Sequence, residues 1–307
     1  MTPWSPVGFA FATAAGNSLI AVCGKAAERS RLRPIAYAVV FQAAAAAVCL
    51  AGTPGESVPW RSARFWGLAL AMGAFYVRAL SAIVVANGLG PASLPWALAN
   101  LSLVVPIALS ALWLHEPLVL LDGAIFAAFL AMVALFVVGM RGGEKTEVTR
   151  PGRYAAALVE VFLANGVLMF GYKLKQGWFG AEGSSGFVAV VFGSGALIGL
   201  ATPAGVAWLR SRGAATGPPA QEPRSDGARR PWKWALAGGV LGGLAAQCLL
   251  AAVQLPAAAV FPIVQGTGLL GGILLIAVIF RERINAWKIA SLAAGLAVVV
   301  MAGLRPP

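Results

Sequence analysis

Long runs of apolar residues, separated by short polar stretches, are the dominant pattern along this chain. A bilayer core about 30 Å thick needs roughly 20 apolar residues per helical span, which is the length of these runs. Only helices pair all their backbone groups internally in lipid, and runs such as 124–138 lack the alternation of a barrel strand. The pattern therefore predicts ten membrane-spanning helices, at residues 6–25, 34–51, 65–86, 91–114, 118–140, 154–174, 186–209, 232–253, 257–280 and 286–304.

Polar connections divide these spans into two groups of five. Residues 141–151 form a linker after the fifth span, and the longer stretch 211–231 is rich in Pro, Gly, Ser and Arg. We therefore expect a first five-helix unit at residues 1–140 and a second at 152–307, with the basic linker 211–231 inside the second.

Matched residues indicate that the two units are repeats of one another. Glu116 and Glu282 end the fourth and ninth spans, and Asn100 and Gln265 precede these glutamates by 16 and 17 residues. In the first and sixth spans an Asn and a Lys eight residues apart recur with a common offset of 148: Asn17 and Lys25, then Asn165 and Lys173. A duplicated five-helix unit accounts for both sets of matches.

Composition removes the soluble alternatives. Of the 307 residues, 59% are hydrophobic and 11% are charged, and the mean hydropathy is +0.81, whereas soluble domains carry about 25% charged residues. So much apolar surface excludes a disordered chain, and three scattered cysteines exclude a disulfide scaffold or a cysteine metal site. The single histidine, His115, excludes two-histidine metal motifs, and neither a P-loop nor a Gly-x-Ser-x-Gly elbow is present. We therefore expect no enzyme activity, no metal and no cofactor.

The net charge of +12 comes from 23 Lys and Arg against 11 Asp and Glu. The basic residues lie mostly between spans, which is what the positive-inside bias of membrane proteins produces, so no nucleic-acid partner is needed to explain them. Ten spans place both termini on one side; five Lys or Arg residues lie there and seventeen lie on the opposite side, with Arg78 inside a span. The charges thus predict that both termini lie outside the cytoplasm.

Two stretches carry a family resemblance: Pro-Ala-Ser-Leu-Pro-Trp…Leu-Trp-Leu-His-Glu-Pro-Leu in the fourth span and Pro-Ala-Ala-Ala-Val-Phe-Pro…Ile-Phe-Arg-Glu-Arg in the ninth. Together with the ten spans and the lysines that end spans one and six, they resemble the drug/metabolite transporter superfamily, EamA type. The resemblance covers nearly the whole chain. It departs at Asn17 and Asn165, where such transporters often carry Trp, and at the long linker 211–231. It implies an inverted repeat around a central cavity, alternating access, and cytoplasmic termini, the reverse of what the charges predict.

Arg78 is the basic residue deepest in an apolar run, with thirteen residues of span 65–86 before it and eight after it. Because a central arginine costs about 2.5–3.5 kcal/mol on insertion scales, we expect it to face the bundle interior or water. There its guanidinium suits a carboxylate or phosphate of a substrate, and a structural ion pair or a snorkelling side chain is the alternative. Glu160, six residues inside the sixth span, is its natural counter-ion and also the candidate for carrying a coupling proton.

Several amides in the spans are candidates for lining a substrate cavity. Ser93, Trp96 and Asn100 follow i, i+3, i+7 spacing, so they share one side of the fourth span. Gln265 stands at the corresponding place in the ninth span. The alternative is hydrogen bonding between helices, worth about 0.6 kcal/mol on average in membrane bundles. The same two interpretations apply to four further residues: Asn17, Gln42, Asn165 and Gln247.

The charged residues at the ends of spans are expected to have structural or gating roles. Glu116 and Glu282 stand beside turns, where they can fix loops or pair with basic neighbours, and Lys25 and Lys173 are expected to be interface anchors or gating residues. Small residues four apart also predict close helix approach, at three glycine pairs: Gly195/Gly199, Gly239/Gly243 and Gly268/Gly272.

The sequence thus predicts an all-α, multi-pass protein of the lipid bilayer, expected in the bacterial inner membrane as a monomer or homodimer. We expect a secondary transporter that moves a small polar or anionic metabolite or drug by rocking of the two repeats. Export is the direction that we expect. A channel is one alternative, and a scaffold or lipid-handling protein is the other. Flux measurements distinguish them, because a channel does not saturate and a scaffold carries no solute.

Overall fold

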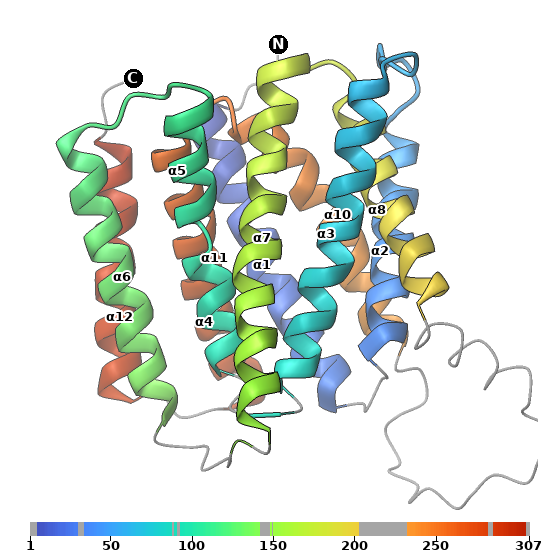
Figure 1. The fold of residues 1–307 in the computed structure, drawn as a ribbon. Coiled ribbons are helices and arrows are strands. Elements are labelled where there is room, and N and C mark those ends of the chain that lie inside the picture. Colours follow the sequence, from blue (N-terminus) through green and yellow to red (C-terminus); the bar gives the residue numbers. More distant parts are fainter. Residues whose placement is uncertain are drawn as a thin grey trace, which may run out of the picture.

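The computed structural model describes residues 5–29, 34–87, 89–90, 93–141, 148, 150–202, 232–281 and 285–304. Within these residues all regular elements are α-helices, which stand side by side in one bundle (Figure 1). The end of the bundle at which α1 begins and α12 ends is called the upper end below, as it is drawn in Figure 1. Glu282 and the linker 211–231 lie outside the described residues.

The helices of the first half are α1 (Pro6–Arg29), α2 (Pro34–Ala51), α3 (Ala63–Asn87), α4 (Ser93–Leu101), α5 (Val104–Trp113) and α6 (Leu120–Arg141). Those of the second half are α7 (Pro151–Phe179), α8 (Ser184–Ala201), α10 (Trp232–Ala252), α11 (Ala257–Phe280) and α12 (Ala286–Gly303).

The helices have the length and composition of membrane spans. Among the described residues nine segments are long and apolar enough to cross a bilayer, counting α4 and α5 as one, and Ile35–Ala51 adds a shorter apolar helix. Large apolar side chains lie exposed along them, as lipid contact requires; Leu112, Leu197 and Val278 are examples. The prediction of an all-helical, multi-pass membrane protein is confirmed.

The fourth span differs from the prediction, because it is two helices rather than one. Pro106 has no backbone N–H, so the carbonyl of Ser102, four residues earlier, loses its helical partner. The hydrogen bonds shift to three-residue spacing at this point: Leu103 N–H donates to Asn100 at 3.2 Å and Val105 N–H donates to Ser102 at 2.9 Å. The helix therefore ends at Leu101 and resumes at Val104.

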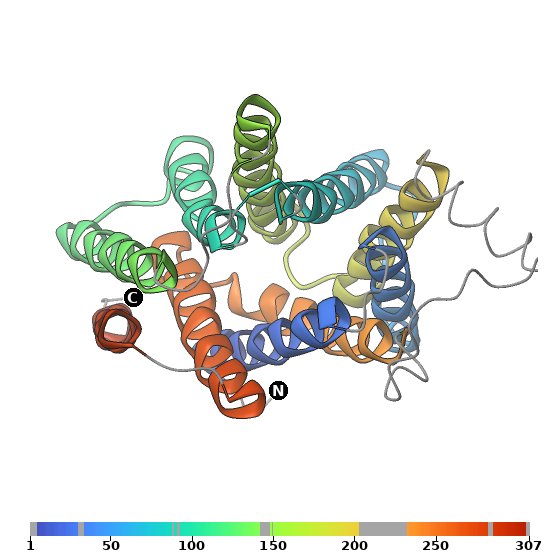
Figure 2. The same ribbon diagram turned by 90° about the horizontal axis from the view of Figure 1, so that it is seen from below.

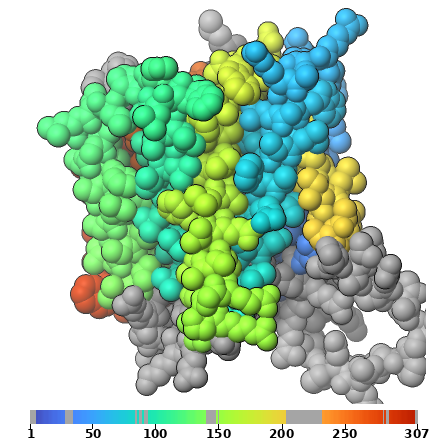
Figure 3. Space-filling model, viewed as in Figure 1, coloured from blue at the N-terminus to red at the C-terminus, as the bar shows by residue number. Residues whose placement is uncertain are grey.

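Helices of one half pack mainly against helices of the other half. α1 lies against α10 and α11, and α7 lies against α3, α4 and α5. The second spans α2 and α8 pack together, and so do the fifth spans α6 and α12, as the view from below illustrates (Figure 2). The apolar core therefore forms between the halves. On the face drawn in Figure 3, side chains of α6, α5, α7 and α3 form the surface.

The glycine pairs lie at these helix contacts. A Cβ on Gly199 would stand 3.1 Å from Val39 of α2, and a Cβ on Gly243 would stand 2.9 Å from the carbonyl oxygen of Ala45, also in α2. In α11, a Cβ on Gly268 would stand 3.3 Å from Asn17 of α1. The predicted close approach of helices at small residues is confirmed.

Candidate functional site

A small central cavity lies between helices from both halves. Its volume is about 60 Å³, well below the roughly 300–1,000 Å³ of typical ligand pockets, so it must widen to hold a solute. The lining residues come from α1, α3, α7, α8, α10 and α11: Thr13, Asn17, Ile20, Tyr76, Met169, Tyr172, Phe192, Gly242, Ala245, Ala246, Leu249 and Val264.

The cavity is polar in part but carries no charge among its lining residues. Asn17 contributes an amide, and Tyr76 and Tyr172 contribute phenol groups from α3 and α7. The ring of Tyr76 packs edge-on against Phe192 with centroids 5.1 Å apart, which gives one wall an aromatic surface. Thr13 is already engaged, because its hydroxyl donates to the carbonyl of Phe9 at 2.9 Å. This arrangement can bind the hydrogen-bonding groups and the apolar part of a small solute.

Arg78 and Glu160 are joined in a salt bridge between α3 and α7, with Nε and Oε1 2.5 Å apart. Neither lines the central cavity. Arg78 follows Tyr76 by two residues, which is about 200° around a helix, so it points away from the cavity that Tyr76 lines. Their side chains are 69% and 37% exposed, consistent with a place on the outer side of the bundle.

Asn165 satisfies the break in the fourth span. Its Nδ2 donates to the carbonyl oxygen of Ala99 at 2.8 Å and to the hydroxyl of Ser102 at 2.7 Å. In an uninterrupted helix the Ala99 carbonyl would accept from Leu103, whose N–H instead donates to Asn100. The hydroxyl of Ser102 also donates to the Ala99 carbonyl, at 2.6 Å, so Asn165 and Ser102 together replace the missing backbone hydrogen bond. Asn17, the repeat partner of Asn165, instead lines the central cavity.

The other predicted amides do not line the cavity. Asn100 uses its Nδ2 to donate to the carbonyl of Trp96 one turn earlier, at 2.8 Å, and the Trp96 side chain is exposed. Gln265 lies next to Val264 in α11 and is half-buried. Gln247 faces the end of α2, where its Nε2 lies 3.5 Å from the place of a Cβ on Gly52.

Lys173 and Glu116 tie three segments together at the upper end. Lys173, which is 5% exposed, forms an ion pair with Glu116 and donates to the carbonyl oxygens of Val253 and Leu255 at 3.1 and 2.9 Å. The second carboxylate oxygen of Glu116 accepts the N–H of Ala257, the first residue of α11, at 2.7 Å. We call these residues the upper network. It joins α7, the α5–α6 connection and the turn between α10 and α11.

Two further charged residues lie at the upper end and were not singled out from the sequence. Glu56, in the α2–α3 connection, accepts the N–H groups of Ser185 and Gly186 in the first turn of α8, at 2.9 and 3.3 Å. Lys175 is fully buried and donates to the carbonyl of Gly180 and the hydroxyl of Ser184, both at 2.8 Å. The available signal was weak: Lys175 is a second cation near the end of an apolar run.

Lys25 lies in the last two turns of α1 and is half-buried. Among the described residues no three His, Cys, Asp or Glu side chains gather where they could hold a metal ion. The three cysteines are unpaired, and Cys23 and Cys49 are buried.

Comparison with known proteins identifies a shared fold. No protein-family model matches the sequence, and no curated protein matches it. A crystal structure of another protein superposes with a TM-score of 0.70 over 97% of this chain and 96% of that chain, at 17% sequence identity. At that identity the likeness concerns the fold alone, and it extends over the whole length of both chains.

Proposed function

We propose that this chain is a secondary transporter that moves a small polar solute without net charge by alternating access between two inverted five-helix repeats. The observation that carries the proposal is the central cavity, which is small and lined by helices of both halves. A site between two bodies that rock against each other is the arrangement by which such transporters expose a solute to one side at a time.

The helix partnerships support the inverted repeat. Exchanging the halves replaces α1 by α7, α3 by α10, and the α4–α5 pair by α11. The contacts of α1 with α10 and α11 then become those of α7 with α3 and with α4 and α5, all of which occur. Five spans per half also reverse the direction of the second half in the membrane. The backbone also adopts the left-handed conformation at corresponding places in the two halves, namely at His115, just before Glu116, and at Arg281, just before Glu282.

The cavity lining supports the substrate class. A buried formal charge without a partner is costly, and the polar groups of the lining are hydroxyls and one amide, none of them charged. The proposal therefore assigns Asn17 and Tyr172 to the solute, and it assigns Arg78 and Glu160 to a salt bridge that joins α3 to α7. An anionic substrate held by Arg78 has less support than an uncharged one.

The upper network supports a gate. Lys173 and Glu116 hold the start of α11 against α7, so opening the cavity toward the upper end requires separating these groups. A buried, fully partnered network of this kind closes one end of the bundle strongly, as a transporter open alternately to two sides requires.

The test begins with the purified full-length chain and a panel of metabolites that carry a net charge of zero, plus one or minus one. A bound solute raises the apparent thermal stability, so neutral members are expected to raise the Tm and anionic members are not. The solute identified is then used for counterflow in proteoliposomes. Saturable exchange is expected; flux that does not saturate indicates a channel, and no flux of any panel member contradicts transport.

The repeat-related asparagines give a matched pair of variants. Asn17→Ala is expected to abolish stabilisation by the solute while the unliganded Tm changes little, because Asn17 lines the cavity. Asn165→Ala is expected to do the opposite, because Asn165 satisfies the helix break. Equal effects of the two substitutions on solute binding would contradict the assigned site.

A further inference from the structure

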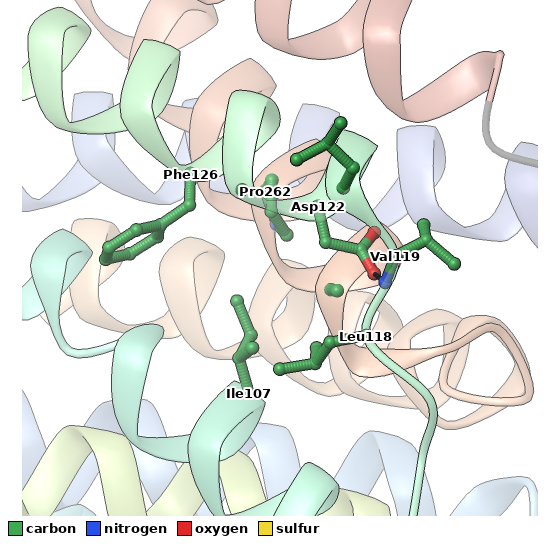
Figure 4. Close-up of a pocket in the computed structure, with 9 residues that line it drawn as sticks. Ile107, Leu118, Val119, Asp122, Phe126 and Pro262 are labelled. Carbon is green, nitrogen blue, oxygen red and sulfur yellow. Dashed lines mark hydrogen bonds between the residues drawn. The ribbon is translucent and has the colours of Figure 1, made fainter.

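A second, larger cavity of about 460 Å³ opens between α5, α6 and α11 (Figure 4). We call it the lateral groove. Its walls are Ile107 from α5, Leu118 from the α5–α6 connection, Phe126 from α6, and Ala258 and Pro262 from α11. In Figure 4 the side chains of Ile107, Leu118, Phe126 and Pro262 surround a common space, which is the cavity.

The groove exists because α5 and α6 diverge. α5 packs against α7, whereas α6 packs against α12, and the connection at residues 114–119 bridges the distance between them. Leucines border the opening, and Leu120 is 95% exposed. All three helices belong to segments with the length and hydropathy of membrane spans, so insertion into a bilayer would place lipid at the mouth of the groove.

The lining selects an apolar chain as the occupant. The residues that line the groove are apolar or glycine apart from Asp122. The carboxylate of Asp122 accepts the N–H of Val119 at 2.9 Å and so caps the start of α6. An apolar cavity does not hold water, because water needs two or more polar partners there. An empty one of this volume leaves its lining atoms without dispersion contacts. An acyl chain from the surrounding leaflet supplies those contacts.

The groove and the central cavity share one wall. Pro262 faces the groove and Val264 faces the central cavity, two residues later and about 200° around α11. The first residue of the same helix, Ala257, is held by Glu116. A chain that fills the groove therefore fixes the position of α11 from the side opposite the central cavity.

We propose that the lateral groove is a binding site for one acyl chain of a bilayer phospholipid, which packs against α11. This inference does not rest on transport, and its test has a separate readout. Lipid tails are as apolar as the groove, so moving an acyl chain from the bilayer into the groove gains little hydrophobic free energy. The site therefore takes its specificity from shape and dispersion contacts.

Gly123 of α6 gives a direct perturbation. It lines the groove, and a Cβ built on it meets no atom within 4 Å, so Gly123→Phe places a ring in the groove without a clash at the backbone. Gly67 of α3 is the matched control, since a Cβ there also meets nothing within 4 Å and the residue is exposed. Gly67→Phe adds the same ring to a helix face away from the groove.

The full-length chain is reconstituted in nanodiscs of phosphatidylcholine that contain a small fraction of the same lipid with a diazirine in one acyl chain. After irradiation, peptide mass spectrometry maps the adducts. In the wild type and in Gly67→Phe we expect adducts concentrated on α5, α6 and α11. In Gly123→Phe we expect their loss, down to the level found on other exposed helix faces.

Two results would overturn the proposal. One is an even distribution of adducts over all exposed helix faces in the wild type, a measurement that needs no variant to fold. The other is a concentrated pattern that persists in Gly123→Phe at the wild-type level. A second readout is the Tm in detergent: added phosphatidylcholine is expected to raise it for the wild type and Gly67→Phe but not for Gly123→Phe.

Discussion

Replacing Lys173 with methionine measures how strongly the upper network holds the two halves together. The ammonium group has three partners, namely the carbonyl oxygens of Val253 and Leu255 and the carboxylate of Glu116. Methionine has a similar length and no donor, so all three acceptors lose a hydrogen bond. Breaking a buried charge pair costs about 3–5 kcal/mol. Because the Glu116 side chain is 22% exposed and regains some water, we expect Lys173→Met to lower the free energy of unfolding by about 3 kcal/mol.

A double-mutant cycle with Glu116→Gln isolates the interaction between the two residues. Glutamine keeps an oxygen for the N–H of Ala257 and carries no charge, so the double variant buries no unpaired carboxylate. The measurement is the free energy of unfolding of the full-length chain in detergent micelles. We expect a coupling energy of about 2 kcal/mol, within the range found for residues in one hydrogen-bond network.

Lys175 provides the control, because it is equally buried in the same helix but bonds to Gly180 and Ser184 instead of Glu116. The effects of Lys175→Met and Glu116→Gln should add. A coupling energy below about 0.5 kcal/mol for Lys173 and Glu116, the usual limit of additivity, would refute the network as described. The same coupling for Lys175 would refute its specificity.

Three further predictions concern stability in the same assay. Gly73→Ala is expected to cost about 2 kcal/mol, because a Cβ there overlaps the backbone of α8, whereas Gly67→Ala on the same helix has open space and should be neutral or stabilising by up to about 1 kcal/mol. Asn165→Leu should cost about 1 kcal/mol, because the Ala99 carbonyl loses one of its two donors and keeps only the hydroxyl of Ser102, and an unchanged Tm would show that the helix break needs no partner from α7. Glu56→Ala should cost about 1 kcal/mol through loss of the cap on α8, and Glu56→Asp should restore part of it.

The spans could be predicted from the sequence because the membrane makes length and apolarity decisive. The break in the fourth span could not, because proline does not determine it alone. Pro262 lies inside α11 without ending it, whereas Pro106 accompanies a break. The difference lies in the neighbour: Asn165 of α7 offers a donor to the carbonyl that the break releases. Ser102 is a second, local donor to the same carbonyl, but Asn165 comes from a distant part of the chain, and no local pattern predicts its position.

The candidate site shows a second limit of prediction from the sequence. A charge in an apolar run, such as Arg78, is conspicuous, but its position along the run gives its depth and not the direction in which it points. The cavity instead gathers Asn17, Tyr76 and Tyr172 from three helices. The chain has only four tyrosines, but nothing in the sequence shows in which direction Tyr76 and Tyr172 point. The upper network was foreseen only as the separate residues Glu116 and Lys173, because their pairing depends on how the halves dock.

The packing of each half against the other has a consequence for how the protein is made. α2 meets α8, and α6 meets α12, so the helices synthesised first have their main partners in the part synthesised last. At about 5–20 residues per second, roughly 10–30 s pass between the completion of α6 and that of α12. During this interval only lipid covers the faces of the early helices against which the glycine pairs of α8, α10 and α11 later pack. Assembly is therefore a late event, and ribosome stalling before α12 leaves a set of inserted helices that cannot complete the bundle.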